Sequence, residues 1–189
     1  MMMIRSVIIM SIKELIIKRR SYNQFTDEKI DADEIIELLN IAVYAPNHKM
    51  REPWRFILLY DEGKQLFLNR YIHALSETEK DLQKKTLDKV FIAPMIVAFV
   101  MPHQKDMKDE LEDLQANAAL IQNFLLLLED QNYAGFWKTP AYIESDTFKD
   151  ILGLTTQEMI VALVMVGKPK GQASYKPRKD AKSKTTIYS

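Results

Sequence analysis

The sequence predicts an α+β fold, because helical hydrophobic patterns alternate with only three or four short strand patterns. Neither an internal repeat nor a linker divides the chain. We therefore expect one domain over residues 11–189, ending in an extended C-terminal tail and preceded by an N-terminal extension over residues 1–10. Hydrophobic residues make up 47% and charged residues 28%, which is typical of a globular protein with a buried core.

The N-terminal half is predicted to begin with a capped helix. Ser11 can cap a helix that runs to about Lys18, and Glu14 completes a capping box three residues later. Periodicity then predicts a helix over 31–43, a strand over 55–60, a turn over 61–63 and a charged amphipathic helix over 64–89.

The C-terminal half continues the alternation. The predicted elements are a strand over 95–101, a long buried helix from 111 to about 131, a short strand within 133–140, a helix from Ser145 to Leu152 and a strand over 158–166. From Gly167 to Ser189 the chain is polar and basic and shows no core pattern.

Charge and composition exclude several classes of function. The 26 basic and 26 acidic residues cancel, so no overall field favours nucleic acid or an anionic membrane. The absence of cysteine removes disulfides, thiolate metal sites and thiol nucleophiles, and the three histidines lack metal-ligand spacing. With neither a membrane-length apolar run nor a signal-peptide layout, we expect a cytoplasmic protein.

The most unusual segment is the connection from Tyr44 to Phe56. It holds two prolines, a histidine, two arginines and a tryptophan, and functional residues often collect in such loops. His48 could instead be an ordinary loop histidine, and Trp54 a packing residue at the start of the strand. We expect Glu52 to pair with Arg51 or Arg55.

Arg19-Arg20-Ser21, at the end of the first helix, has two interpretations. Cations at a helix C-terminus complement the macrodipole without any ligand. Alternatively, paired guanidinium groups and a hydroxyl can bind a phosphate group. The residues alone leave both open.

The residues offer no protein nucleophile and no convincing acid–base pair. The carboxylate pairs Asp109/Glu110 and Glu112/Asp113 lie in a charged helical run without the context of a site, and there is no glycine-rich phosphate loop. If the chain is an enzyme, a cofactor must carry the chemistry.

Four motifs in order resemble the nitroreductase-like flavoprotein family, in its compact bacterial subgroup of NAD(P)H nitroreductases. They are Arg19-Arg20-Ser21 followed by Phe25, the segment from Ala45 to Phe56, an Ala/Asn/Gln helix over 116–128 with the strand from Gly135 to Thr139, and the closing Gly167-Lys168-Pro169 with Lys176-Pro177-Arg178. The likeness covers about Ser11 to Lys179.

The resemblance implies a mostly antiparallel sheet of about four or five strands, and an interlocked homodimer with FMN at the subunit interface. The family's cofactor-binding positions correspond here to Arg19, Arg20, Ser21, Tyr44, His48, Trp137, Lys138, Thr139, Lys176 and Arg178. No protein residue is expected to be catalytic, because the flavin carries the chemistry.

The resemblance also implies the reaction. An FMN-dependent oxidoreductase of this family takes hydride from NADH or NADPH in a ping-pong cycle and reduces a small electron-poor acceptor, such as a nitroaromatic or a quinone. The alternatives are a flavin-binding protein without turnover and a binding module that uses its basic surface.

Overall fold

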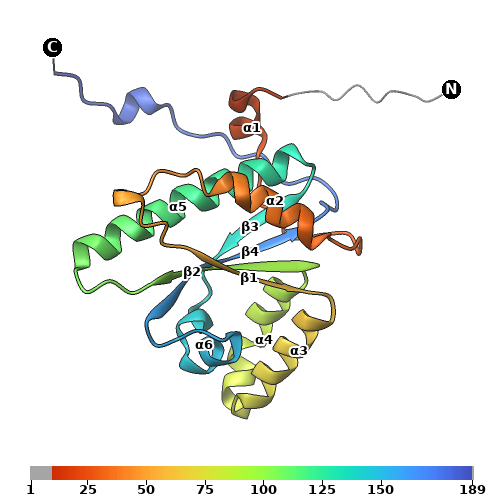
Figure 1. Ribbon diagram of the computed structural model, residues 1–189. Helices are drawn as coiled ribbons and strands as arrows, with labels where there is room; N and C mark the ends of the chain where they lie inside the picture. Colours follow the sequence, from red (N-terminus) through yellow and green to blue (C-terminus); the bar gives the residue numbers. More distant parts are fainter. Residues whose placement is uncertain (1–9, 189) are drawn as a thin grey trace.

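The computed structural model describes residues 10–188, in which four strands form one antiparallel sheet with helices on both faces (Figure 1). The strand order is β1–β2–β4–β3, so β1 and β3 are the edges. The strands are β1 Arg55–Tyr60, β2 Met95–Pro102, β3 Ala134–Lys138 and β4 Glu158–Gly167. The predicted α+β class and antiparallel sheet are confirmed. The predicted N-terminal extension, residues 1–10, lies outside the described residues except for Met10.

Helices lie on both sides of the sheet (Figure 1). One side carries α1 (Ile12–Lys18), α2 (Ala32–Ala42) and α5 (Met107–Asp130), and the other carries α3 (Asp61–Ala74), α4 (Glu77–Phe91) and α6 (Asp146–Leu152). Short 3₁₀ turns are η1 (His48–Met50), η2 (Ala141–Glu144) and η3 (Ala181–Lys184).

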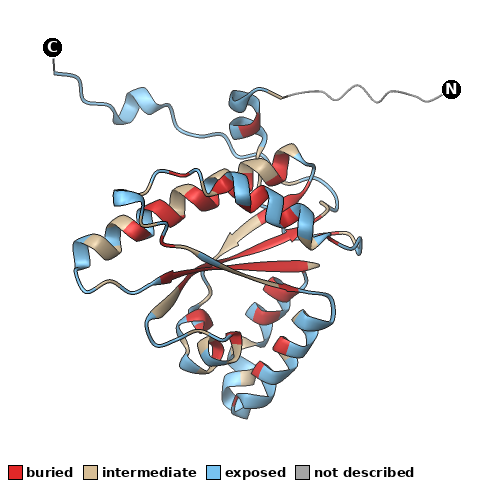
Figure 2. Ribbon diagram, viewed as in Figure 1, coloured by how far each residue is buried: buried red, intermediate tan, exposed pale blue. Residues whose placement is uncertain are grey.

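The sheet is buried on both faces because successive side chains of β2 point to opposite helix layers. Val97 and Phe99 pack toward α2 and α5, whereas Ile96 and Ala98 pack toward α3, α4 and α6. Burial is concentrated along the sheet and on the inner faces of the helices (Figure 2).

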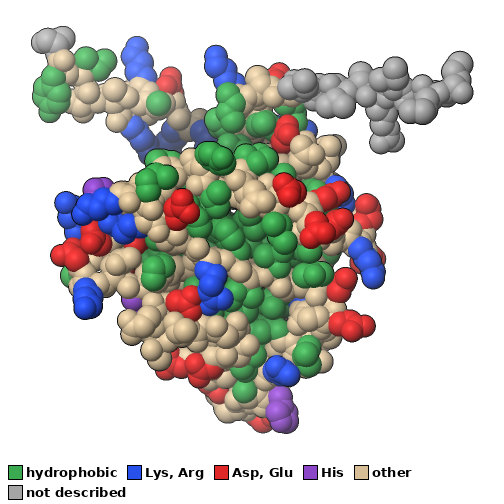
Figure 3. Space-filling view, viewed as in Figure 1, with side chains coloured by type: hydrophobic (Ala, Val, Ile, Leu, Met, Phe, Trp, Pro, Cys, Tyr) green, Lys and Arg blue, Asp and Glu red, His purple; other side chains and the backbone are tan. Residues whose placement is uncertain are grey.

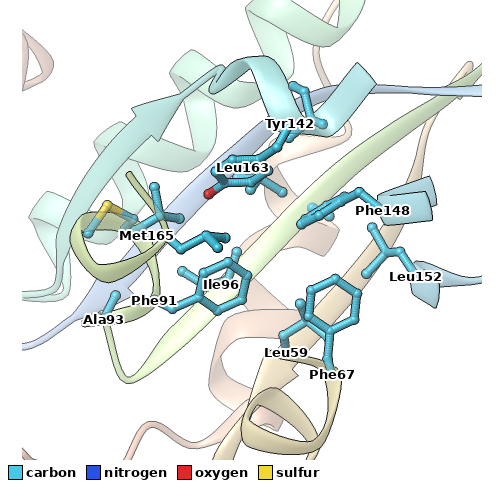
Figure 4. Packing of buried hydrophobic residues seen from close by; sticks show 14 of the residues in the cluster. Leu59, Phe67, Phe91, Ala93, Ile96, Tyr142, Phe148, Leu152, Leu163 and Met165 are labelled. Atoms are coloured by element: carbon cyan, nitrogen blue, oxygen red, sulfur yellow. The ribbon is translucent and has the colours of Figure 1, made fainter. Parts of the chain in front are cut away.

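An aromatic cluster holds the layer formed by α3, α4 and α6 against the sheet (Figure 4). Phe148 of α6 is fully buried, and its ring centroid lies 5.1 Å from that of Phe67 and 5.1 Å from that of Tyr142. This layer carries none of the predicted site residues and serves as the scaffold for the opposite face.

Several predicted boundaries are wrong. The predicted turn over 61–63 is the first turn of α3, and the single helix predicted over 64–89 is two helices, since Ser76 caps α4 in a capping box with Glu79. Helix α5 begins four residues before the predicted position 111, where Asp106 caps it with its side chain. Glu52 does not pair with either arginine: Arg51 binds acidic residues of α5, and Arg55 binds Glu158.

The pair formed by Arg55 and Glu158 joins β1 to the start of β4. Arg55 donates from Nε to Glu158 Oε1 at 2.6 Å and from Nη2 to Oε2 at 2.9 Å. These bonds, together with those from Thr155, lower the pKa of Glu158 from its ordinary value of 4.5 to about 2.

We expect Glu158→Gln to destabilise the protein by about 1 kcal/mol at neutral pH, since Arg55 is partly exposed and its charge is screened by solvent. The folded-state pKa is lowered, so the stabilisation is complete above the ordinary value of 4.5 and is lost as the pH falls toward 2. Urea unfolding of both proteins across this range measures the difference. A difference that does not shrink on acidification would contradict the assignment.

Candidate functional site

The predicted site residues form two groups near opposite ends of α5. One group lies around the end of α1, the edge strand β3 and the C-terminal tail. The other lies in the connection between α2 and β1. Figure 1 shows α1 and the tail together above one end of the long helix.

In the first group, the segment after α1 is laid against the sheet. Ser21 forms a parallel bridge with Gly135 of β3, and Phe25 forms an antiparallel bridge with Pro169 after β4. Gly167 allows this approach, because a Cβ at this position would lie 2.6 Å from the Phe25 ring. Arg19 and Arg20 are thereby held beside the start of β3.

The two arginines play different parts. Arg20 donates from Nη1 to the carbonyl oxygens of Ile17 and Arg19, the latter at 2.8 Å, so it satisfies the C-terminal end of α1. Its guanidinium lies 4.9 Å from the ring centroid of Tyr175, a cation–π contact. This contact brings the C-terminal tail next to the end of α1. Of the two interpretations of Arg19-Arg20-Ser21, the one that needs no ligand therefore applies to Arg20, which stabilises the C-terminal end of α1.

Arg19 lies in a cluster of like charges. Burial, and then the charge of Arg20 and that of Arg178, lower the pKa of Arg19, while Glu129 acts in the opposite direction. Glu129 is itself buried, and its Oε1 lies 3.7 Å from Lys18 Nζ. Arg19 thus feels two other guanidinium groups and one carboxylate that is already paired with Lys18, which leaves positive charge for an anion.

Strand β3 presents a free edge beside this cluster. Its inner edge pairs with β4, and within residues 10–188 its outer edge pairs only at Gly135, with Ser21. Trp137 packs toward the α2–α5 core, whereas Lys138 points to the other face, with Nζ 3.6 Å from the ring centroid of Phe136. Burial and the neighbouring charge of Lys89 lower the pKa of Lys138. Thr139 is exposed at the end of the strand.

The second group lies in the connection after α2. The Tyr44 side chain is 88% exposed and lines an open hollow of about 510 Å³ together with Val43, Met50 and Glu52. His48 begins η1, and its Nε2 lies 3.8 Å from Glu112 Oε2 near the start of α5.

One chain does not bring the two groups together. His48 lies against Glu112, whereas Arg19 is influenced by Glu129, and α5 advances about 25 Å between these two carboxylates. This separation exceeds the reach of a mononucleotide cofactor. Lys176, in the tail, is exposed, and its backbone oxygen accepts a hydrogen bond from Arg178 at 3.4 Å.

Three residues that belong to these two groups were not predicted from the sequence. Tyr175 and Glu129 join the arginine cluster, and Arg51 binds the acidic start of α5. The acidic pairs of α5 are evident in the sequence, but nothing in the pattern links them to Arg51, about 60 positions away.

The arginine cluster and the free edge of β3 together fit a ligand that combines a phosphate group with a planar ring. Guanidinium groups bind phosphate oxygens, and a free strand edge can pair with the amide groups of a heterocycle. Among residues 10–188, no group of acidic or histidine side chains could hold a metal ion, and none of the helices in this part of the chain is long and apolar enough to cross a membrane.

Known proteins resemble this chain in both sequence and fold. The model of the "Nitroreductase family" matches residues 16–168. "Putative NAD(P)H nitroreductase YfhC" of Bacillus subtilis is 30% identical over 184 residues, covering 93% of each chain. The crystal structure of a nitroreductase-like family protein from Bacillus cereus has a TM-score of 0.88 at 31% identity, covering 95% of this chain and 97% of that one. The FMN and NADPH-dependent nitroreductase NfnB from Sphigopyxis sp. strain HMH has the same fold, with a TM-score of 0.77 at 16% identity, covering 95% and 100%.

Proposed function

Because the chain belongs to the nitroreductase family, we propose that it is an FMN-dependent oxidoreductase that uses NADH or NADPH to reduce small electron-poor acceptors. The observation that carries this proposal is the cluster of Arg19, Arg20 and Arg178 beside the free edge of β3. A similar protein is named an NAD(P)H nitroreductase, and a protein with the same fold is described as FMN-dependent.

The phosphate of FMN would be held by Arg19, Ser21 and Arg178, with Lys176 adding charge from the tail. Arg19 has the strongest reason to bind it, since burial and the charges of Arg20 and Arg178 lower the pKa of this arginine, and a phosphate dianion would offset both effects. Arg20 would contribute by its charge while its Nη1 closes the end of α1.

The ring system would lie along Trp137, Lys138 and Thr139, where the outer edge of β3 offers backbone donors and acceptors. Lys138 would place a cation beside the ring, and a fixed cation stabilises negative charge as it develops. Bound FMN would supply the hydride chemistry that the side chains lack. We propose nitroaromatics and quinones as the acceptors. Both would take electrons directly from the reduced flavin, so the protein needs no nucleophile of its own.

A second copy of the chain would complete the site. In a two-fold dimer with antiparallel α5 helices, the arginine cluster of one chain meets the Tyr44–His48 connection of its partner, and the symmetry makes two such sites. The face that carries α1 and α2 supports this arrangement, since hydrophobic side chains gather there (Figure 3). The exposed apolar residues of α1 and α2 are Ile12, Ile16, Ile17, Ile36 and Ile41.

The proposed reaction has a direct optical test. Purified protein saturated with FMN should show a flavin spectrum, and NADH or NADPH added without oxygen should bleach it, with colour returning on addition of a quinone or nitroaromatic. Protein that retains no flavin would contradict the proposal. Flavin that is retained but not bleached by either nicotinamide would support a flavin-binding protein without turnover.

The phosphate assignment predicts that Arg19→Ala raises the Kd for FMN by about 10- to 100-fold, the loss of one charged hydrogen-bonding partner. The effect should be much smaller for riboflavin, which lacks the phosphate. Quenching of flavin fluorescence measures both constants. Arg70→Ala is the matched control, because Arg70 is an exposed arginine on α3, in the opposite layer. Equal losses for FMN and riboflavin would count against the assignment.

The shared site can be tested with mixed dimers. Arg19→Ala damages one half of each site, and the double variant Tyr44→Ala/His48→Ala damages the other half. If each site combines two chains, coexpression should restore tight binding in about a quarter of the sites, since each mixed dimer has one fully native site. If both halves came from the same chain, mixing the variants would restore none.

A further inference from the structure

The connection that carries Tyr44 and His48 contains a strained stretch. Lys49, Met50 and Glu52 have φ angles of 53°, 52° and 47°, a left-handed conformation that side chains other than glycine rarely adopt. The side chain of Asn47 gives some local support, since its Oδ1 accepts from the Glu52 amide at 3.0 Å. Such strain persists only where surrounding contacts impose it.

Arg51 supplies those contacts, because its guanidinium binds three acidic residues in the first turns of α5. Nε donates to Asp113 Oδ1 at 2.8 Å, Nη2 donates to Glu112 Oε2 at 3.2 Å, and Nη1 donates to Asp109 Oδ1 at 3.3 Å. Nη2 also donates to the backbone oxygen of Asp109 at 3.2 Å. Asp113 is fully buried, so this ion pair is enclosed on the carboxylate side.

A second anchor follows one turn further along the helix. The buried Asn117 donates from Nδ2 to the backbone oxygen of Pro53 at 2.7 Å and to that of Asp113 at 3.0 Å. Arg51 and Pro53 are therefore fastened to the same face of α5, on either side of Glu52.

The same contacts reach His48. Glu112 accepts a hydrogen bond from Arg51, and its Oε2 also lies 3.8 Å from His48 Nε2. Loss of Arg51 would free Glu112 to rotate, release the strained stretch and leave the buried Asp113 without its cation. Each change would displace the half of the site that carries Tyr44 and His48.

We propose that Arg51 is a positioning residue, which clamps the Tyr44–His48 connection onto α5 through Asp113 and thereby orders that half of the flavin site. The inference rests on the proposed function for its effect on FMN, whereas the clamp itself can be measured without any flavin. Arg51 acts through other residues and makes no contact with the cofactor in this scheme.

The chain provides a matched control. Arg55, four residues later, also forms a two-pronged pair with a glutamate, Glu158, but this pair joins β1 to β4, and its side chain makes no hydrogen bond to residues 44–54. Arg55→Met removes one positive charge and one arginine–carboxylate pair, as Arg51→Met does, but leaves the clamp in place. An effect seen only in Arg51→Met is therefore due to the clamp.

The first measurement is hydrogen exchange of the flavin-free protein, followed by mass spectrometry. In Arg51→Met, amides of residues 47–52 should exchange at least about tenfold faster than in the unaltered protein, while peptides from β2 and β4 keep their rates. Arg51→Lys should fall between the two, because lysine keeps the charge but not the fork. Arg55→Met should leave residues 47–52 unchanged. Equal exchange in all four proteins would overturn the clamp.

The second measurement is FMN affinity, with a variant that protects the fold. Arg51→Met leaves Asp113 buried without a cation, although Gln104 still donates to its Oδ2 at 2.7 Å. The double variant Arg51→Met/Asp113→Leu, which removes both charges, is therefore compared at matched thermal stability. We expect its Kd for FMN to rise by about tenfold, with Arg55→Met close to the unaltered protein. If the stable double variant binds FMN normally, the positioning role is overturned. If the unaltered protein binds no FMN, the proposed function fails, and the exchange result still decides whether the clamp exists.

Discussion

A group of predicted site residues lies near each end of helix α5, and the proposed flavin site depends on the spacing between them. Glu112 lies against His48 near the start of the helix, and Glu129 lies among the cations near its end. The 24-residue helix is continuous and buried along one face from Asp113 to Glu129, so it keeps the two segments apart within one chain. A second chain related by a two-fold axis is the simplest way to unite them.

Charge is distributed differently at the two ends. Near the start of α5, three acidic residues surround the guanidinium of Arg51, so its charge is more than compensated and none is left over for an anionic ligand. Near its end, the charges of Arg20 and Arg178 act on Arg19, the nearby carboxylate of Glu129 is already paired with Lys18, and positive charge is left over. The first arrangement holds a segment in place, and the second is suited to receive an anionic ligand. The different charge balance is why we assign one arginine to positioning and another to binding.

Local signals in the sequence were sufficient for most of the elements. The capping box of Ser11 and Glu14 and the apolar strands led to correct predictions, and the motif around Arg19 led to the arginine cluster. The similar capping box of Ser76 was missed because the charged amphipathic pattern continues across it. The link between Arg51 and Asp113 could not be predicted, since pairing across 62 positions depends on the packing of α5 and leaves no periodic trace. The placement of Tyr175 under Arg20 is equally a product of the tertiary fold.

Native mass spectrometry of the FMN-loaded protein is the sharpest test of a site shared by two chains, because it counts chains and cofactors in one particle. We expect a particle of two chains with two FMN molecules, and we expect separated single chains to carry none. A single chain that retains FMN on its own would contradict the account, since it would mean that the arginine cluster needs no second copy to form a complete site.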